Sequence, residues 1–247
     1  MNILRIIPNL FTLANLFCGI LAVNYVVLNN FEKAALFVVI AIGFDFFDGF
    51  LARVFGVSGD FGKQLDSLAD MVTSGVVPGL TMYYLLYLNI LPTLSDDDVT
   101  VSLGRMEYDA GFLPYVGLLL SLGACYRLAT FNLDENQSKS FSGLPTPAMC
   151  LFIISLPMIQ IYSQNETILD LLKSNYFLIG VTLALSLLMN IPLKVMALKF
   201  SNFSIRENLL KYLLILSSVV LLIWMRYTAV PIIITLYIGL SLFAKTE

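Results

Sequence analysis

Apolar runs long enough to cross a lipid bilayer recur along this chain from one end to the other. A bilayer core holds no water to satisfy backbone N–H and C=O groups, so such a run must be helical unless it closes into a barrel. The alternation of apolar and polar residues that is typical of barrel strands is absent. The sequence therefore predicts an all-α fold, a polytopic transmembrane bundle of about eight helices. Their expected positions are about 6–28, 34–53, 61–90, 112–129, 149–162, 176–189, 209–224 and 230–243.

Composition narrows the possible functions further. Of the 247 residues, 58% are hydrophobic and 13% are charged, which excludes an ordinary soluble domain. The net charge of −3 argues against nucleic acid as a partner, because phosphate backbones call for a clustered basic surface. The chain has no histidine, which excludes Ser-His-Asp triads, HExxH zinc sites and phosphohistidine chemistry. Any catalysis must use carboxylates, hydroxyls, basic groups and hard metal ions.

Four carboxylates at helical spacing, in two pairs, interrupt this apolar pattern between residues 45 and 70. Asp45 and Asp48 fall in the last turns of the second expected helix, and Asp66 and Asp70 fall in the first turns of the third. An ionised side chain at bilayer depth costs about 2.5–3.5 kcal/mol, so such residues are usually paired, liganded or functional. At about 100° per residue each pair lies on one helix face, and adjacent antiparallel helices would bring the two pairs face to face.

Clustered carboxylates repel one another unless a cation lies between them. Hard divalent ions such as Mg²⁺ prefer oxygen ligands, so this stretch predicts a site for one or two such ions. Two ions about 3.5–4 Å apart can clamp a transferring phosphoryl group. Gly49 lacks a Cβ and lets a phosphate approach, and Arg53 can bind that phosphate. Alternatively, Arg53 only marks the inner membrane boundary.

The same stretch resembles a known family. The pattern Asp45-x-x-Asp48-Gly49-x-x-Ala52-Arg53-x8-Gly62-x-x-x-Asp66-x-x-x-Asp70 is similar to the full signature of the CDP-alcohol phosphotransferases. The resemblance implies a homodimer with a six-helix membrane core, here 1–190, and a two-helix extension at 191–247. It also implies transfer of a phosphoryl-linked group from a CDP-activated donor to an alcohol, with release of CMP.

The resemblance also implies roles for individual residues. Asp45, Asp48 and Asp66 would hold the divalent ions, two Mg²⁺ or Mn²⁺, and Asp70 would complete the site and act as general base on the acceptor hydroxyl. The residues expected to contact the donor and its nucleotide are Asn9, Thr12, Gly49, Ala52, Arg53 and Gly62.

Two further segments, Arg127–Asn132 and Phe141–Ala148, resemble those of membrane-integrated phosphatidylserine synthases. This resemblance implies L-serine as the acceptor and CDP-diacylglycerol or CDP-archaeol as the lipid donor. A zwitterionic acceptor needs a cation for its carboxylate, and the candidates are Arg127 and Lys139. Asn132 and Ser142 are candidates for polar positioning. Alternatively, Arg127 and Lys139 only follow the excess of positive charge on the cytoplasmic side.

Other functions fit part of the pattern. Glycerol phosphate or an inositol phosphate as acceptor would need a more basic pocket. An ion-coupled transporter would need broken helices and an internal repeat, and the sequence shows neither. With the N-terminus inside, the 14 Lys and Arg residues divide ten to four in favour of the cytoplasmic side. We therefore expect a multi-pass protein of the cytoplasmic membrane with the acidic cluster facing the cytoplasm.

Overall fold

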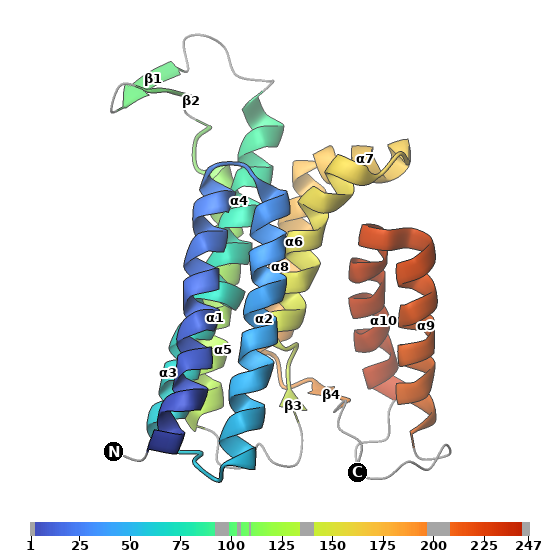
Figure 1. The fold of residues 1–247 in the computed structure, drawn as a ribbon. Helices are drawn as coiled ribbons and strands as arrows, with labels where there is room; N and C mark the ends of the chain where they lie inside the picture. Colours follow the sequence, from blue (N-terminus) through green and yellow to red (C-terminus); the bar gives the residue numbers. More distant parts are fainter. Residues whose placement is uncertain are drawn as a thin grey trace.

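The structure is a computed structural model that describes residues 3–91, 99–102, 105–108, 110–133, 141–196 and 208–243. Long helices run side by side through the molecule (Figure 1). They are α1 (Ile3–Val27), α2 (Phe31–Val54), α3 (Asp60–Asp70), α4 (Val77–Ile90), α5 (Leu119–Leu133), α6 (Thr146–Tyr162), α8 (Asn175–Asn190), α9 (Leu209–Met225) and α10 (Ala229–Phe243). A π-helical turn, η1 (Met71–Val76), joins α3 to α4 in one rod, so these helices form eight rods and the expected bundle is confirmed.

Within the described residues, five helical segments are long and apolar enough to cross a membrane. They are Leu4–Val27, Phe31–Val54, Asp60–Ile90, Leu113–Leu133 and Leu209–Leu242. The last of these turns back at Arg226, which has φ 49°, and α9 and α10 form a helical hairpin (Figure 1). A sixth span arises if α7 (Glu166–Lys173) and α8, which meet at a bend of 76°, are taken together. The protein is therefore a multi-pass helical membrane protein.

Several elements differ from the sequence-based expectation. The connection between α4 and the 3₁₀ segment η4 (Leu113–Leu118) contains an antiparallel hairpin of β1 (Val99–Ser102) and β2 (Arg105–Tyr108). A second ribbon pairs β3 (Phe141–Ser142) with β4 (Lys194–Val195). Helix α7 was not expected, because its eight residues are far too few for the membrane-spanning runs on which the prediction was based. Helix α5 also continues to Leu133, four residues past its expected end.

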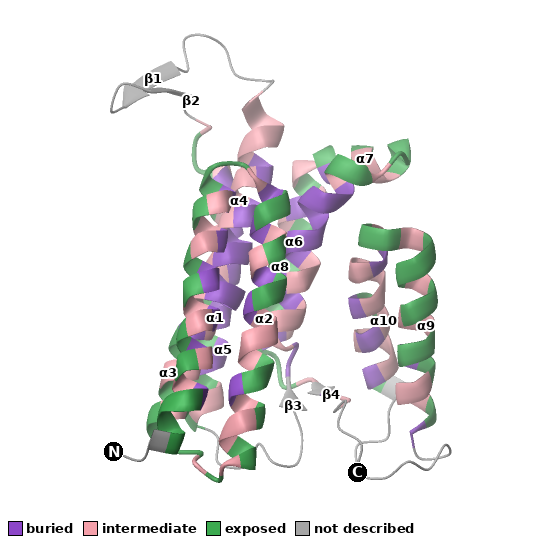
Figure 2. Ribbon diagram, viewed as in Figure 1, coloured by how far each residue is buried: buried purple, intermediate pink, exposed green. Residues whose placement is uncertain are grey.

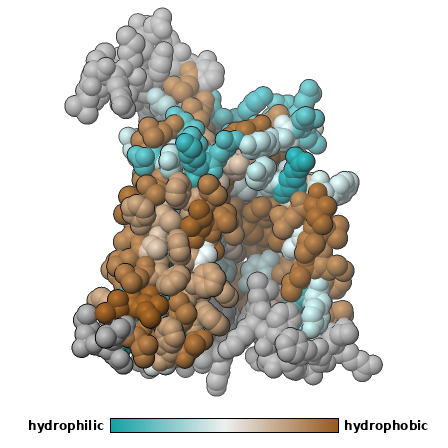
Figure 3. Space-filling view, in the orientation of Figure 1, coloured by the Kyte–Doolittle hydropathy of each residue, from teal (hydrophilic) through white to brown (hydrophobic). Residues whose placement is uncertain are grey.

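Buried side chains gather along the inner faces of α4, α5, α6 and α8 (Figure 2). The fully buried ones include Met82, Leu86, Leu120, Met149 and Ile153. In the space-filling view, apolar side chains cover the middle of the molecule and polar ones gather at the end that carries α7 (Figure 3). Lipid tails are as apolar as these faces, so helix contacts depend on close packing through small residues.

Glycines permit that close packing where α4 meets α5. A Cβ added to Gly79 would lie 2.0 Å from Ser121 Oγ, and one added to Gly75 would lie 3.3 Å from the Cβ of Ala124. The backbone of the η1–α4 segment therefore lies directly against α5. This contact fixes the rod that carries Asp66 and Asp70 against the rest of the bundle.

Candidate active site

A tight turn between α2 and α3 creates the site. The turn contains Gly56 with φ +61°, a left-handed conformation that glycine adopts without the steric cost of a Cβ. Because the turn is short, α2 and α3 run antiparallel, and α1 packs against both of them. Asp45 and Asp48 are thereby brought to face Asp66.

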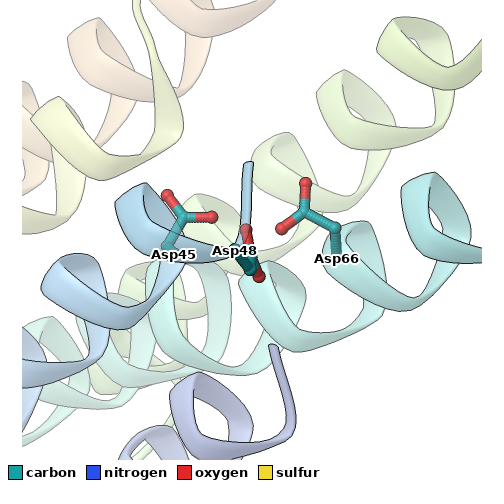
Figure 4. Close-up of side chains that lie close together, drawn as sticks. All are labelled: Asp45, Asp48 and Asp66. Carbon is teal, nitrogen blue, oxygen red and sulfur yellow. The ribbon is translucent and has the colours of Figure 1, made fainter. Parts of the chain in front are cut away.

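The carboxylates of Asp45, Asp48 and Asp66 form one group. An oxygen from each lies within 4.8 Å of the others, and Asp48 lies between the other two in Figure 4. Asp48 is buried, and Asp45 and Asp66 are half-buried. Asp66 Oδ1 is buried and has no hydrogen-bond partner within the described part of the chain. An ion about 2.1–2.5 Å from each oxygen would satisfy these groups, so the donor set fits a hard divalent cation.

Helix α1 supplies a hydroxyl that holds one of the three carboxylates. Thr12 Oγ1 donates a hydrogen bond of 2.5 Å to Asp48 Oδ2, and both residues are buried. The bond fixes the rotation of the Asp48 carboxylate and leaves Oδ1 for a ligand. Supporting hydrogen bonds of this kind orient the carboxylates that bind metal ions.

Asp70 lies apart from this group of three. It is one helical turn beyond Asp66 on α3, and its Oδ1 accepts a hydrogen bond of 3.3 Å from Asn15 Nδ2. Three of the four expected aspartates therefore form the cluster, and the fourth lies next to it, held by α1. Its expected roles as a metal ligand and as a base stay predictions.

A cavity of about 500 Å³ opens beside the cluster. Asp48 and Asp66 line it. All six residues expected to contact the donor line it as well: Asn9, Thr12, Gly49, Ala52, Arg53 and Gly62. A Cβ added to Gly49 would meet no atom within 4 Å, so the cavity wall is open at that point. The structure thus brings together residues from α1, α2 and α3 that the sequence pattern had only suggested.

Two basic residues of the cavity were missed in the sequence. Arg5 and Lys63 line it together with Arg53, so three cationic side chains surround a space bordered by carboxylates. Their positions could have been inferred, because Arg5 lies one turn before Asn9 on α1 and Lys63 directly follows Gly62 on α3. Cations and a metal site around one cavity suit a ligand with several phosphate oxygens.

The residues expected to bind the acceptor are more dispersed, and neither Arg127 nor Asn132 lines this cavity. Arg127 is buried on α5, with Nη2 3.5 Å from Gly143 O and with Nε unpartnered among the described residues. Asn132 Oδ1 accepts from Ser67 Oγ at 3.0 Å, and this bond links α5 to α3. Lys139 lies outside the described residues, and of Ser142 only the backbone, in β3, is described.

A multi-pass helical bundle with an oxygen-rich, cation-lined cavity at one end defines a class of membrane-embedded proteins whose cavity has the donor groups for a hard cation and a phosphate-bearing ligand. Residues 5–224 match the model of the CDP-alcohol phosphatidyltransferase family. The chain therefore belongs to this family and is an enzyme of this type, as its signature predicts. The family match gives no support to the alternative of an ion-coupled transporter.

Named relatives narrow the comparison. The CDP-diacylglycerol--serine O-phosphatidyltransferase of Bacillus subtilis is 34% identical over 155 residues, which are 60% of this chain and 75% of that protein. The protein of the same name from Helicobacter pylori strain J99 is 32% identical over 62% of this chain and 57% of its own length. The archaetidylserine synthase of Methanothermobacter thermautotrophicus is 29% identical over 64% of this chain. That match spans 60% of the archaeal protein, so the chain matches less than two thirds of the last two relatives.

Proposed function

We propose that this enzyme transfers a phosphatidyl or archaetidyl group from a CDP-lipid to the hydroxyl of L-serine and releases CMP. The observation that carries the proposal is the group formed by Asp45, Asp48 and Asp66, of which Asp48 and Asp66 line a cavity that three basic residues also line. The names of the relatives support serine as the acceptor and leave both ester-linked and ether-linked lipids as donors.

In this proposal, Asp45, Asp48 and Asp66 hold two divalent ions, Mg²⁺ or Mn²⁺. Bound ions of this kind neutralise the charge that develops on a diphosphate as it is cleaved. Thr12 keeps the Asp48 carboxylate in place through its 2.5 Å hydrogen bond. Arg53 and Arg5 supply further positive charge for the diphosphate from the lining of the cavity. Lys63 also lines the cavity, and its Nζ would have to leave Asn132 O, to which it donates at 2.8 Å, to join them.

Asp70 is the proposed general base. It takes the proton from the serine hydroxyl while the serine oxygen attacks the phosphorus that carries the lipid. The bond between that phosphorus and the CMP oxygen breaks, and CMP leaves with the bonding electrons. The position of Asp70, one turn from Asp66 and outside the group of three, leaves its carboxylate available for this proton.

The buried guanidinium of Arg127 is the proposed contact for the serine carboxylate. A buried cation is costly unless an anion or several acceptors pair with it, and its Nε has no partner within the described residues. Asn132, Lys139 and Ser142 remain predicted acceptor contacts. The carboxylate of a substrate bound near α5 would satisfy Arg127 directly.

The site lies at the end of the bundle where the α2–α3 turn and the N-terminus are found (Figure 1). We propose that this end faces the cytoplasm and that the protein is a homodimer in the cytoplasmic membrane, in contact with its lipids. The excess of Lys and Arg in the segments expected on this side supports the orientation. The division into a 1–190 core and a 191–247 extension stays a prediction.

The experiment is an assay of CMP release by the purified protein in lipid nanodiscs. It combines CDP-diacylglycerol, Mg²⁺ or Mn²⁺, and L-serine, glycerol phosphate or inositol phosphate in separate reactions. Release that requires serine supports the proposal, and release with only a phosphorylated acceptor contradicts it. Asp70→Asn should abolish turnover and spare much of the metal binding, whereas Asp170→Asn, an exposed change on α7, should alter neither. If the Asp70→Asn variant still turned over, Asp70 could not be the general base.

A further inference from the structure

We propose that Asn15 and Thr73 are positioning residues that hold the Asp70 carboxylate in the orientation needed to accept a proton. The inference rests on the proposed role of Asp70 as the general base. Neither residue belongs to the aspartate cluster or lines the cavity. Both are fully or almost fully buried, with exposed fractions of 0% for Asn15 and 1% for Thr73.

Three side chains form a hydrogen-bonded chain between α1 and the α3–α4 rod. Thr73 Oγ1 donates to Asn15 Oδ1 at 2.8 Å, and Asn15 Nδ2 donates to Asp70 Oδ1 at 3.3 Å. An ionised carboxylate only accepts hydrogen bonds, so Asp70 requires the amide nitrogen of Asn15 to point at it, and the amide oxygen then faces the donating hydroxyl of Thr73. One oxygen of the Asp70 carboxylate is thereby fixed, and Oδ2 is the oxygen left to take the proton.

The π-helical turn places Thr73 at this point. It begins directly after Asp70, and its i to i+5 pattern changes which backbone carbonyls are paired within the helix. Neighbouring helices bind two of these carbonyls. Cys150 Sγ of α6 lies 3.4 Å from Thr73 O, and Ser121 Oγ of α5 donates to Gly75 O at 2.9 Å. The turn is therefore held from two sides and gives Thr73 a fixed location.

A glycine on α1 lets this helix come close enough to the π-helical turn for these hydrogen bonds to form. A Cβ added to Gly19 would lie 2.4 Å from Thr73 Oγ1 and 3.3 Å from Thr73 Cα. Asn15 lies one helical turn before Gly19, so the close approach of the two helices brings its amide within reach of the hydroxyl. The backbone geometry thus supports the same assignment as the side-chain contacts.

Thr73→Val tests the inference, because it removes the hydroxyl and keeps the shape of the side chain. Loss of one hydrogen bond that orients the base should lower kcat about fivefold to tenfold, the equivalent of about 1–1.4 kcal/mol. The KM for the CDP-lipid and the affinity for CDP-lipid in the absence of acceptor should not change. Thr73→Ser keeps the hydroxyl and should restore kcat.

Thr81→Val is the matched control. Thr81 is equally buried, on the same rod, and its hydroxyl donates only within the helix, to Val77 O at 2.8 Å. Its removal should leave kcat unchanged. The inference is overturned if Thr73→Val keeps kcat within about twofold of the wild type, if Thr81→Val loses as much, or if KM rises in place of a fall in kcat.

Asn15→Leu provides a second test that does not depend on the folding of Thr73→Val. Leucine keeps the branched shape of asparagine and has no hydrogen-bond donor or acceptor, so the bond to Asp70 is lost and kcat should fall further than in Thr73→Val. A wild-type kcat in this variant would overturn the inference while the proposed function stands. An inactive wild-type protein with every acceptor would instead overturn the proposed function, and the inference with it.

Discussion

Replacement of Thr12 by valine should weaken metal binding at the aspartate cluster. The hydroxyl of Thr12 is 2.5 Å from Asp48 Oδ2, and Thr12 and Asp48 are only 3% and 6% exposed, so water cannot easily replace the lost bond. A hydrogen bond to a charged group contributes about 1.5–3 kcal/mol. Loss of a residue that supports a metal ligand typically costs about 10–100-fold in metal affinity, or about 1.4–2.7 kcal/mol. The two estimates agree.

The assay is a titration of CMP release with Mg²⁺ and with Mn²⁺. Thr12→Val should move the half-saturating metal concentration up about 10–100-fold, and most of the rate should return at saturating metal. Thr12→Ser keeps the hydroxyl and should stay near the wild-type midpoint. Thr182→Val, at a buried threonine that bonds only within its own helix, is the control for loss of a buried hydroxyl. An unchanged midpoint in Thr12→Val would refute the view that this bond prepares Asp48 for a cation.

Three further outcomes are expected. Residues that only support a metal ligand typically contribute about 10–100-fold, and Asp66→Asn should lower turnover by more than that because it changes a ligand itself. Near-normal activity of this variant at saturating Mn²⁺ would contradict the assigned metal site. Gly19→Ala should lower kcat by forcing α1 away from Thr73, whereas Gly180→Ala, where an added Cβ meets nothing within 4 Å, should not; equal effects of the two would argue against a role for the close contact. EDTA should abolish CMP release without loss of the helical circular dichroism signal, and excess Mg²⁺ or Mn²⁺ should restore it; activity that survives chelation would show that no divalent ion is needed.

The sequence predicts the aspartate cluster well because its determinants are local. Asp45 and Asp48 share a helix face by their spacing, and a short connection to the next helix forces the antiparallel arrangement that brings in Asp66. The bond from Thr12 to Asp48 is different, since 36 residues separate its partners. The family resemblance assigns Thr12 to the donor site, but only the packing of α1 against α2 selects Asp48 as its partner.

The acceptor residues show where spacing fails. Helix α5 continues to Leu133, so Arg127 and Asn132 both lie on one regular helix. Five residues at about 100° each separate them by about 140° around the axis, so they point to different sides of α5 and would have to meet one acceptor from two directions. Arg127 accordingly faces Gly143, and Asn132 contacts Ser67. The sequence-based helix ended at residue 129, so the different directions of the two side chains could not be seen from the sequence.

The π-helical turn absorbs one extra residue within the α3–α4 rod. Its wider i to i+5 turn advances less per residue than an α-helix, so the extra residue adds little net rotation between Asp70 and α4. Deletion of one residue from Met71–Val76 would therefore let the rod regain regular i to i+4 pairing and leave Leu85 and Leu86 in the core. The local loss would fall on the turn itself, where Thr73 would be displaced from Asn15. A shortened variant should thus fold normally and lose the hydroxyl that contacts α1.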